Sequence, residues 1–204
     1  MMRFICSDAL PWLEEHRNVG SIVTSLPDAE EIGVDMPEWS LWFRHAAGLC
    51  MRCASHDAVS VFYQTDRKCA GELHSKAALL FLAAEDAGVH AIWHKIILRR
   101  KAGATDIHRP GFTHMVAFTN SARPGAATPD VIERGHMAYP NAMGENAAMV
   151  ALTSAMRCGL RVVDPFCGRG TVPKIADAMG MDAIGIDIDP KQIALASTPT
   201  LYNQ

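Results

Sequence analysis

Acidic residues and glycines near the C-terminus have the spacing of a nucleoside-binding site. In residues 161–196 a short β-branched run ends in Asp164 and leads into the turn Cys167-Gly168-Arg169-Gly170-Thr171. An apolar-periodic helix and a second strand that ends in Asp187 follow. Glycine lets a backbone approach a ligand closely, and an acid about 20 residues after the first can accept hydrogen bonds from ribose hydroxyls. The segment therefore predicts a βαβ unit that holds a nucleoside.

The turn differs from a phosphate-binding fingerprint, because GxGxxG is absent and an acid precedes the glycines. That carboxylate would repel a pyrophosphate but can pair with a cationic ligand. The run DPFCGRGT resembles the DPFxGxGT motif of S-adenosylmethionine-dependent methyltransferases, especially the permuted amino-methyltransferases of DNA and RNA. A glycine-rich turn in another nucleotide-binding fold is the alternative. The resemblance implies S-adenosylmethionine as cofactor, bound by Asp164, Pro165, Phe166, Cys167, Gly168, Gly170, Thr171, Asp187 and Ile188.

The first strand of the chain also leads into an acid. Arg3-Phe4-Ile5-Cys6 reads as a strand, and Asp8 follows it before a short helix over 9–16. SDALPWL is similar to the opening GDxLxxL of the permuted enzymes, where the acid reaches toward the adenosine of the cofactor. The resemblance gives Asp8 that role, and an N-cap of the helix is a compatible alternative.

The second strand, over 21–24, runs into Ser25-Leu26-Pro27-Asp28. The resembling family carries its catalytic motif here, DPPY or SPPY, in which an oxygen and a carbonyl hold the target amine and the aromatic stacks on a flipped base. Leu26 replaces the first proline and Asp28 replaces the aromatic. We therefore expect Ser25, Leu26, Pro27 and Asp28 at the site of methyl transfer, where Asp28 would position or deprotonate the nucleophile. An ordinary strand-end turn is the alternative, and Trp39, Trp42, Phe43 or Tyr139 are candidate replacement rings or core residues.

The remaining pattern predicts an α/β fold. Strands are expected over 58–64, 91–98 and 112–119, and helices over 38–53 and 72–87, with a further helix that opens near Met143. Together with the strands above these make seven. The resemblance implies a Rossmann-like, mostly parallel, seven-stranded class I methyltransferase sheet that is circularly permuted, because the cofactor motif comes last.

Composition bounds the remaining possibilities. The 204 residues are 49% hydrophobic with a formal net charge of −3, which fits one domain without a global basic field. We expect a single methyltransferase domain over 1–204, with a catalytic-motif half (1–120), a linker or substrate loop (121–141) and a cofactor-motif half (142–204). Scattered cysteines and the lack of a long apolar run favour a cytoplasmic protein that does not span a membrane.

Metal binding is not expected. The spacing Cys50-Met-Arg-Cys53 stands alone and favours core cysteines over zinc, and His90 and His94 on a strand stand too far apart to share an ion easily. A homodimer is possible, for example through the helix over 38–53.

Two loops carry cations suited to a polyanionic substrate. The segment 99–111 is expected to bind substrate through Arg99, Arg100, Lys101 and Arg109, and the segment 120–141 contains Arg123, Arg134 and His136. A solvated loop is the alternative. Neither is long enough for a separate recognition domain, so we predict a base in a structured RNA such as tRNA or rRNA as acceptor. The alternatives are a small molecule, DNA N4-cytosine or N6-adenine, and a catalytically inactive cofactor-binding scaffold.

Overall fold

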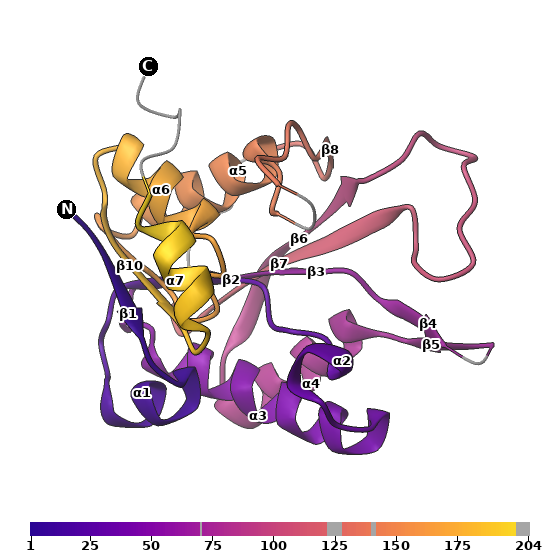
Figure 1. Cartoon of the computed structure of the whole chain (residues 1–204), viewed down its shortest axis with the longest axis horizontal. Coiled ribbons are helices and arrows are strands. Elements are labelled where there is room, and N and C mark those ends of the chain that lie inside the picture. Colours follow the sequence, from indigo (N-terminus) through magenta and orange to yellow (C-terminus); the bar gives the residue numbers. More distant parts are fainter. Residues whose placement is uncertain (70, 122–127, 140–141, 199–204) are drawn as a thin grey trace.

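The computed structural model describes residues 1–69, 71–121, 128–139 and 142–198 (Figure 1). Eight strands within these ranges form one sheet, and two more form a separate hairpin. In spatial order the sheet contains β1 (Met2–Cys6), β10 (Asp182–Asp187), β9 (Arg161–Asp164), β2 (Ser21–Thr24), β3 (Ser60–Gln64), β7 (Phe112–Thr119), β6 (His90–Leu98) and β8 (Val131–Glu133).

The sheet is parallel apart from one strand. The pairs β1–β10, β10–β9, β9–β2 and β2–β3 are all parallel. β7 is antiparallel to both β3 and β6, so β6 and its parallel neighbour β8 run in the same direction as β3. Every strand except β7 therefore ends at the same edge of the sheet, where ligands of such sheets bind.

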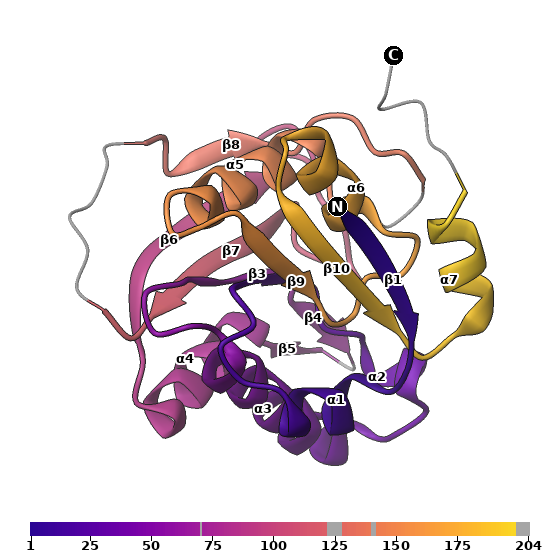
Figure 2. The ribbon, with the colours of Figure 1, turned by 90° about the vertical axis from the view of Figure 1, so that its left-hand side faces the viewer.

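The Rossmann-like, mostly parallel sheet predicted from the sequence is confirmed, with one addition. β8 lies within the segment 121–141, which was expected to be a linker, and it adds an eighth strand beside β6. The division of the chain into halves and its circular permutation stay predictions. Figure 2 shows β1 alongside β10, so the first strand extends the sheet beyond the C-terminal βαβ unit.

Helices cover both faces of the sheet (Figure 1). One face carries α1 (Ala9–Glu15), α3 (Met36–Cys53) and α4 (Lys76–Ala87), and the short α2 (Ala29–Ile32) lies near them. The other face carries α5 (Glu145–Met156), α6 (Thr171–Ala178) and α7 (Pro190–Ala196). Each buried strand contributes alternate side chains to the two resulting cores. For example, Ile22 and Phe62 pack toward α3, whereas Val23 and Val61 pack toward α5.

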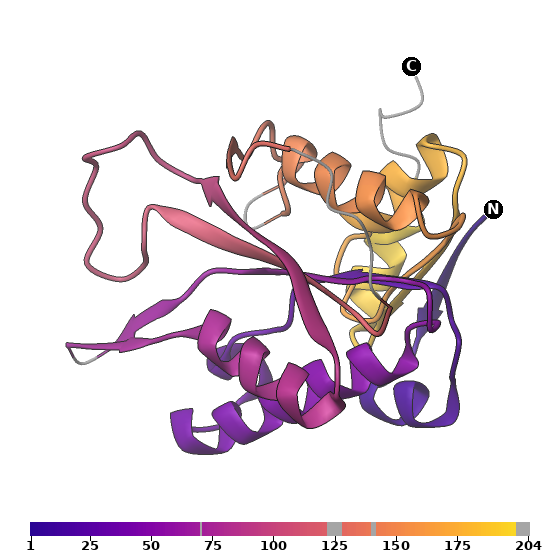
Figure 3. The same cartoon turned by 180° about the vertical axis from the view of Figure 1, so that it is seen from behind.

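One predicted helix begins later than expected. The helix over 72–87 starts at Lys76, because Glu72–His74 forms β5 and pairs with β4 (Arg67–Cys69) in a hairpin. Ser75 then caps α4 by accepting a hydrogen bond from the Ala78 N–H. The hairpin and the loop between β6 and β7 extend from the same end of the molecule (Figure 3). They are joined there, since the Lys68 N–H donates to the carbonyl of His108 at 3.0 Å.

The helix over 38–53, which was named as one possible dimer surface, buries its apolar face within the chain. Trp39, Phe43, Cys50 and Cys53 of α3 are buried in the core between the sheet and the neighbouring helices. The apolar face of α3 is therefore used within the chain. No helix among the described residues is both long enough and apolar enough to cross a membrane.

Gly170 allows a close approach that any side chain would block. It has a φ of 78° at the start of α6, and a Cβ there would lie 2.7 Å from the Phe4 ring. We expect Gly170→Ala to lower the free energy of unfolding by about 1–2 kcal/mol for the left-handed backbone and by about 1–3 kcal/mol more for overpacking. Urea denaturation measures both contributions together.

Gly180→Ala is the matched control, because Gly180 also has a φ of 78° but a Cβ added there would meet no atom within 4 Å. It should lose only the backbone contribution. Equal losses in the two variants would show that contact with Phe4 does not constrain position 170.

Candidate active site

A cavity of about 810 Å³ lies at the carboxyl ends of β1, β2, β9 and β10. This volume is typical of sites for small molecules and cofactors. Its wall brings together segments from both ends of the chain: Asp8, Ala9, Leu10, Ser25, Leu26, Pro27, Glu31, Ile32, Trp42, Tyr139, Ala142, Met143, Asp164, Pro165, Phe166, Cys167, Gly168, Arg169, Thr171, Val172, Asp187, Ile188, Asp189 and Gln192.

Asp164 is a buried carboxylate in this wall. Its Oδ1 accepts hydrogen bonds from the Thr24 hydroxyl at 2.7 Å and from the Phe166 N–H at 3.2 Å. Burial raises the pKa of Asp164 to about 7, and the nearby charge of Asp187 adds to the rise. Oδ2 has no protein donor among the described residues, so the group can accept a positively charged ligand.

Asp187 fixes the glycine turn from the end of β10. Its Oδ2 accepts from the Gly168 N–H at 2.8 Å, and its Oδ1 accepts from the Asp189 N–H at 2.9 Å. Each carboxylate oxygen has a second lone pair, which a ligand hydroxyl can use. A Cβ at Gly168 would find its nearest neighbour, the Tyr139 hydroxyl, at 3.9 Å, so this turn is open to a ligand.

Asp8 is the predicted N-cap of α1, and its contact with the adenosine of a cofactor stays a prediction. It caps α1 by accepting from the Leu10 N–H at 3.0 Å, and it also lines the cavity. The wall therefore carries three of the predicted carboxylates, Asp8, Asp164 and Asp187. A site with this charge favours a cationic nucleoside over a nucleoside polyphosphate.

The cavity has aromatic walls. The rings of Trp42 and Phe166 meet edge to face with centroids 5.9 Å apart. Tyr139 accepts a hydrogen bond from the Thr171 hydroxyl at 3.0 Å and lies under the guanidinium of Arg169. Of the four rings that the sequence offered as replacement platforms, Trp42 and Tyr139 line the cavity, whereas Trp39 and Phe43 are buried in the core.

The motif after β2 reaches the same cavity. Ser25 is exposed there, and its hydroxyl has no hydrogen-bond partner in the described part of the chain. Leu26 is buried, and the carbonyl of Pro27 accepts a hydrogen bond from the Trp39 indole at 3.1 Å. The core therefore holds the backbone of this motif and leaves the serine hydroxyl available.

Asp28 does not line the cavity. Its side chain is buried and accepts hydrogen bonds from the Lys76 ammonium, from Arg109 at 2.9 Å and from Arg67 at 3.5 Å. The Lys76 side chain is only 4% exposed. Burial lowers the pKa of Lys76, and Asp28 opposes that shift. Asp28 is thus the counter-ion of a buried cation and links the motif to α4, the hairpin and the loop 99–111.

The predicted substrate cations lie beyond the cavity wall. Arg109 pairs with Asp28, Arg100 pairs with Asp106 at 2.6 Å, and Lys101 is exposed. Arg99 follows β6 directly, and one of its terminal nitrogens lies 3.5 Å from the carbonyl of Pro110. Arg123 lies outside the described residues. The role of these side chains in substrate binding stays a prediction.

The residues named from the sequence and those that line the cavity overlap but are not the same. One named residue lies outside the lining, and several lining residues were not named. Gly170 does not line the cavity and instead accommodates Phe4. Glu31 does line it, and its carboxylate accepts a hydrogen bond from the Asp28 N–H at 2.6 Å. Arg169, Asp189 and Gln192 also face it. The sequence Asp189-Pro190 was a helix-start signal that could have located α7 and this part of the wall.

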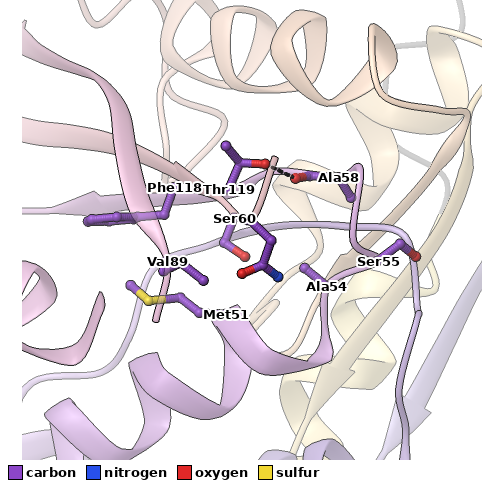
Figure 4. Close-up of a pocket in the computed structure, with 9 residues that line it drawn as sticks. Met51, Ala54, Ser55, Ala58, Ser60, Val89, Phe118 and Thr119 are labelled. Atoms are coloured by element: carbon purple, nitrogen blue, oxygen red, sulfur yellow. Dashed lines mark hydrogen bonds between the residues drawn. The ribbon is translucent and has the colours of Figure 1, made fainter. Parts of the chain in front are cut away.

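A second hollow, at the opposite end of β3, is not a ligand site (Figure 4). It lies among Met51, Ala54, Val89 and Phe118, and the Thr119 hydroxyl beside it donates to the carbonyl of Ala58 at 2.9 Å. It leaves no space for a water-sized sphere.

The buried pair of Asp28 and Lys76 predicts a large effect on stability. We expect Asp28→Ala to lower the free energy of unfolding by about 3–5 kcal/mol, because it leaves the Lys76 charge buried without its carboxylate. Glu30→Ala, which removes the exposed partner of Arg67, should cost less than about 1 kcal/mol. Urea denaturation compares the two. Adding Lys76→Met to Asp28→Ala should restore much of the loss, and a small cost for Asp28→Ala alone would contradict the assignment.

No protein-family model and no curated protein matches this sequence. Solved structures do match it. TTHA0409 of Thermus thermophilus, provisionally named a DNA modification methylase, was solved in complex with S-adenosyl-L-methionine. It matches with a TM-score of 0.71 at 17% identity over 96% of this chain and 93% of its own.

Two further structures extend the comparison. The complex of M1.HpyAVI with its cofactor SAM matches with a TM-score of 0.65 at 13% identity, over 96% of this chain and 98% of that one. The cytosine-N4-specific PvuII DNA methyltransferase matches with a TM-score of 0.67 at 14% identity, over 95% and 84%. The resemblance drawn from DPFCGRGT is thus confirmed at the level of the fold. The chain shares its fold with these proteins, of which two were solved with S-adenosylmethionine and one is named a DNA methyltransferase.

Proposed function

We propose that this chain is an S-adenosylmethionine-dependent methyltransferase that acts on an amino group of a nucleic-acid base. The observation that carries the proposal is the shared cavity. The DPFCGRGT turn, Asp187 and Asp8 form one side of it, and Ser25 to Pro27 form the other. A cofactor and an acceptor bound there would meet across a single opening.

The residues present fit this cofactor. Asp187 and the open backbone at Gly168 suit a ribose, and the edge-to-face pair of Trp42 and Phe166 offers apolar surface to an adenine. Asp164, with one oxygen free, suits a positive charge. When bound, S-adenosylmethionine supplies an electrophilic methyl group on a sulfonium. The protein then contributes mainly proximity and orientation.

Ser25 is the best-placed residue to orient the acceptor. Its hydroxyl is exposed in the cavity and free of protein partners among the described residues, so its oxygen can accept a hydrogen bond from an amine. Asp28 does not contact the acceptor directly, because its carboxylate is paired with Lys76, Arg109 and Arg67. We therefore assign Asp28 a positioning role. Glu31, which accepts a hydrogen bond from the Asp28 N–H, is the carboxylate of this segment that lines the cavity.

The comparisons favour DNA over the RNA acceptor that the sequence analysis placed first. That preference rested on the absence of a separate recognition domain. The chain nevertheless covers 98% of M1.HpyAVI and 84% of the PvuII enzyme, which is named a DNA methyltransferase. A chain of this size is therefore compatible with an acceptor in DNA. RNA is kept as the alternative, because Asp28 stands where the stacking aromatic of the resembling motif would be.

Methyl transfer from labelled S-adenosylmethionine tests the proposal. Unmodified DNA, tRNA, rRNA and a small-metabolite fraction, all from cells that lack this protein, are offered as acceptors. We expect label in DNA, carried on an exocyclic amine after digestion. Ser25→Ala should reduce the rate by roughly 10–100-fold, since the amine loses an orienting hydrogen bond.

The distribution of label separates the alternatives. Arg161→Gln, at the opposite edge of the sheet, is the control and should transfer methyl groups at the rate of the unsubstituted chain. Label in RNA alone would move the acceptor to RNA, and label only in metabolites would exclude a nucleic-acid substrate. No label in any fraction, with cofactor binding intact, would favour a scaffold without catalysis.

The raised pKa of Asp164 predicts that cofactor binding depends on pH. The folded protein holds this proton up to about pH 7, whereas the unfolded chain releases it near the ordinary value of 3.8. The contribution of Asp164 to the free energy of unfolding therefore falls as the pH rises from about 4 to about 7.

A cationic ligand favours the ionised form of Asp164. The affinity for S-adenosylmethionine should therefore rise about tenfold between about pH 6 and about pH 8, with release of a proton.

Calorimetry in buffers of different ionisation enthalpy measures both the affinity and the proton release. Asp164→Asn should bind more weakly and should lose the pH dependence over this range. An unchanged affinity between pH 6 and pH 8 in the unsubstituted protein would contradict contact between Asp164 and a positive charge.

A further inference from the structure

Two arginines follow neighbouring strands at the carboxyl ends of the sheet, where the cavity also lies. Arg99 follows the last residue of β6, and Arg134 follows the last residue of β8. These strands are parallel with Leu98 opposite Glu133, and the Arg134 N–H donates to the carbonyl of Leu98 at 3.2 Å. The two arginines are therefore neighbours across the strand pair, at the carboxyl ends where the cavity also opens.

Their charges are not balanced within the described part of the chain. Arg100 has Asp106 and Arg109 has Asp28 as a partner, but neither Arg99 nor Arg134 forms an ion pair there. The Nε of Arg134 is buried without a hydrogen-bond partner among the described residues. Burial lowers the pKa of Arg99, and the nearby charge of Arg109 lowers it further, with smaller contributions from Arg134 and Arg100. A half-buried pair of like charges with unused donors is costly unless an anion joins it.

Arg134 is in direct contact with the segment that lines the cavity. A Cβ at Gly144 would lie 2.2 Å from the carbonyl oxygen of Arg134 and 2.3 Å from its Cγ, so Arg134 packs closely over this glycine. The two residues before Gly144, Ala142 and Met143, line the cavity. An anion held by Arg134 would therefore lie next to the cavity wall.

We propose that Arg99 and Arg134 bind a backbone phosphate of the nucleic-acid strand that carries the methyl acceptor. Guanidinium groups match the oxygens of a phosphate with paired donors, and contacts to phosphate position a strand without reading its sequence. The overall charge of −3 means that attraction to a polyanion must be local. Arg109 and Arg67 link this part of the molecule to the motif at Ser25 through Asp28, but they are paired and add no unbalanced charge.

This inference rests on the proposed function and names how its acceptor is held. It also distinguishes among the cations of the loop 99–111. Arg100 is occupied by Asp106, and Lys101 is exposed. Arg99 is therefore the member of that run that contributes to the phosphate site, together with Arg134 from another segment.

Binding of oligonucleotides at several salt concentrations tests the site. The probes are labelled single-stranded DNA and RNA of the same sequence, and the competitors are a nucleoside monophosphate and inorganic phosphate. We expect the double variant Arg99→Gln, Arg134→Gln to bind the strand on the order of tenfold more weakly. Between about 50 and about 200 mM salt, the slope of log affinity against log salt concentration should be smaller in magnitude for the double variant than for the unsubstituted chain, by roughly 1–2.

Arg161→Gln is the matched control, because it removes one arginine charge at the amino end of β9, on the opposite edge. It should keep the affinity and the salt slope of the unsubstituted chain. Arg134→Lys should keep part of the affinity because it keeps the charge. Calorimetry should give the double variant the same affinity for S-adenosylmethionine as the unsubstituted chain. That result would show that the fold and the cavity are intact.

Each outcome bears on the proposal. DNA or RNA binding that depends on both arginines supports it and shows which strand is preferred. An unchanged salt slope in the double variant would overturn it. So would a lack of oligonucleotide binding, or equal competition by the monophosphate or inorganic phosphate. Arginine-dependent strand binding by a chain that does not bind S-adenosylmethionine would instead refute the proposed function alone.

Discussion

The Thr24 hydroxyl donates a 2.7 Å hydrogen bond to Asp164, across 140 residues of sequence. This buried contact joins the end of β2 to the end of β9, and the cavity opens around it. It requires the strand that precedes Ser25 to lie beside the strand that precedes the glycine turn, and the parallel β2–β9 pairing provides that arrangement. The hydrogen bond also stabilises a carboxylate whose burial raises its pKa to about 7. The motif and the turn consequently face one another only because the two ends of the chain share a single sheet.

A second buried interaction accounts for the acid at position 28, where the resembling motif has an aromatic. Asp28 pairs with Lys76 of α4 and accepts from Arg67 and Arg109, which belong to the hairpin and the loop 99–111. A ring at position 28 could not neutralise these cations. Asp28 is thus an electrostatic anchor for two projecting segments (Figure 3). The same side of the sheet continues through Arg99 to Arg134, so the cavity, the motif and the basic residues follow one another along the carboxyl ends of the strands.

Local geometry made the C-terminal unit predictable. Gly168 and Gly170 have left-handed backbones, and Asp164 and Asp187 end strands, so their residue types are tightly constrained by position. Pairings between distant segments left no such local signal. Nothing near Asp28 in the sequence indicates Lys76, 48 residues away. The second strand of the hairpin, β5, was read as the start of a helix because this three-residue strand lacks an alternating apolar pattern. Arg99 and Arg134 become neighbours only through β8, which sequence analysis had placed in a linker.

We infer that the acidic cavity selects a cationic nucleoside, and calorimetric titration with S-adenosylmethionine, ATP and NAD measures this selectivity. We expect one S-adenosylmethionine per chain and no binding of the two phosphate-bearing nucleotides, because Asp8, Asp164 and Asp187 repel their phosphates. Asp187→Ala should weaken binding of S-adenosylmethionine by about 1.5–3 kcal/mol, as expected for a lost hydrogen bond to a charged group. Tight binding of ATP or NAD, or an affinity for S-adenosylmethionine that does not change in Asp187→Ala, would contradict the account.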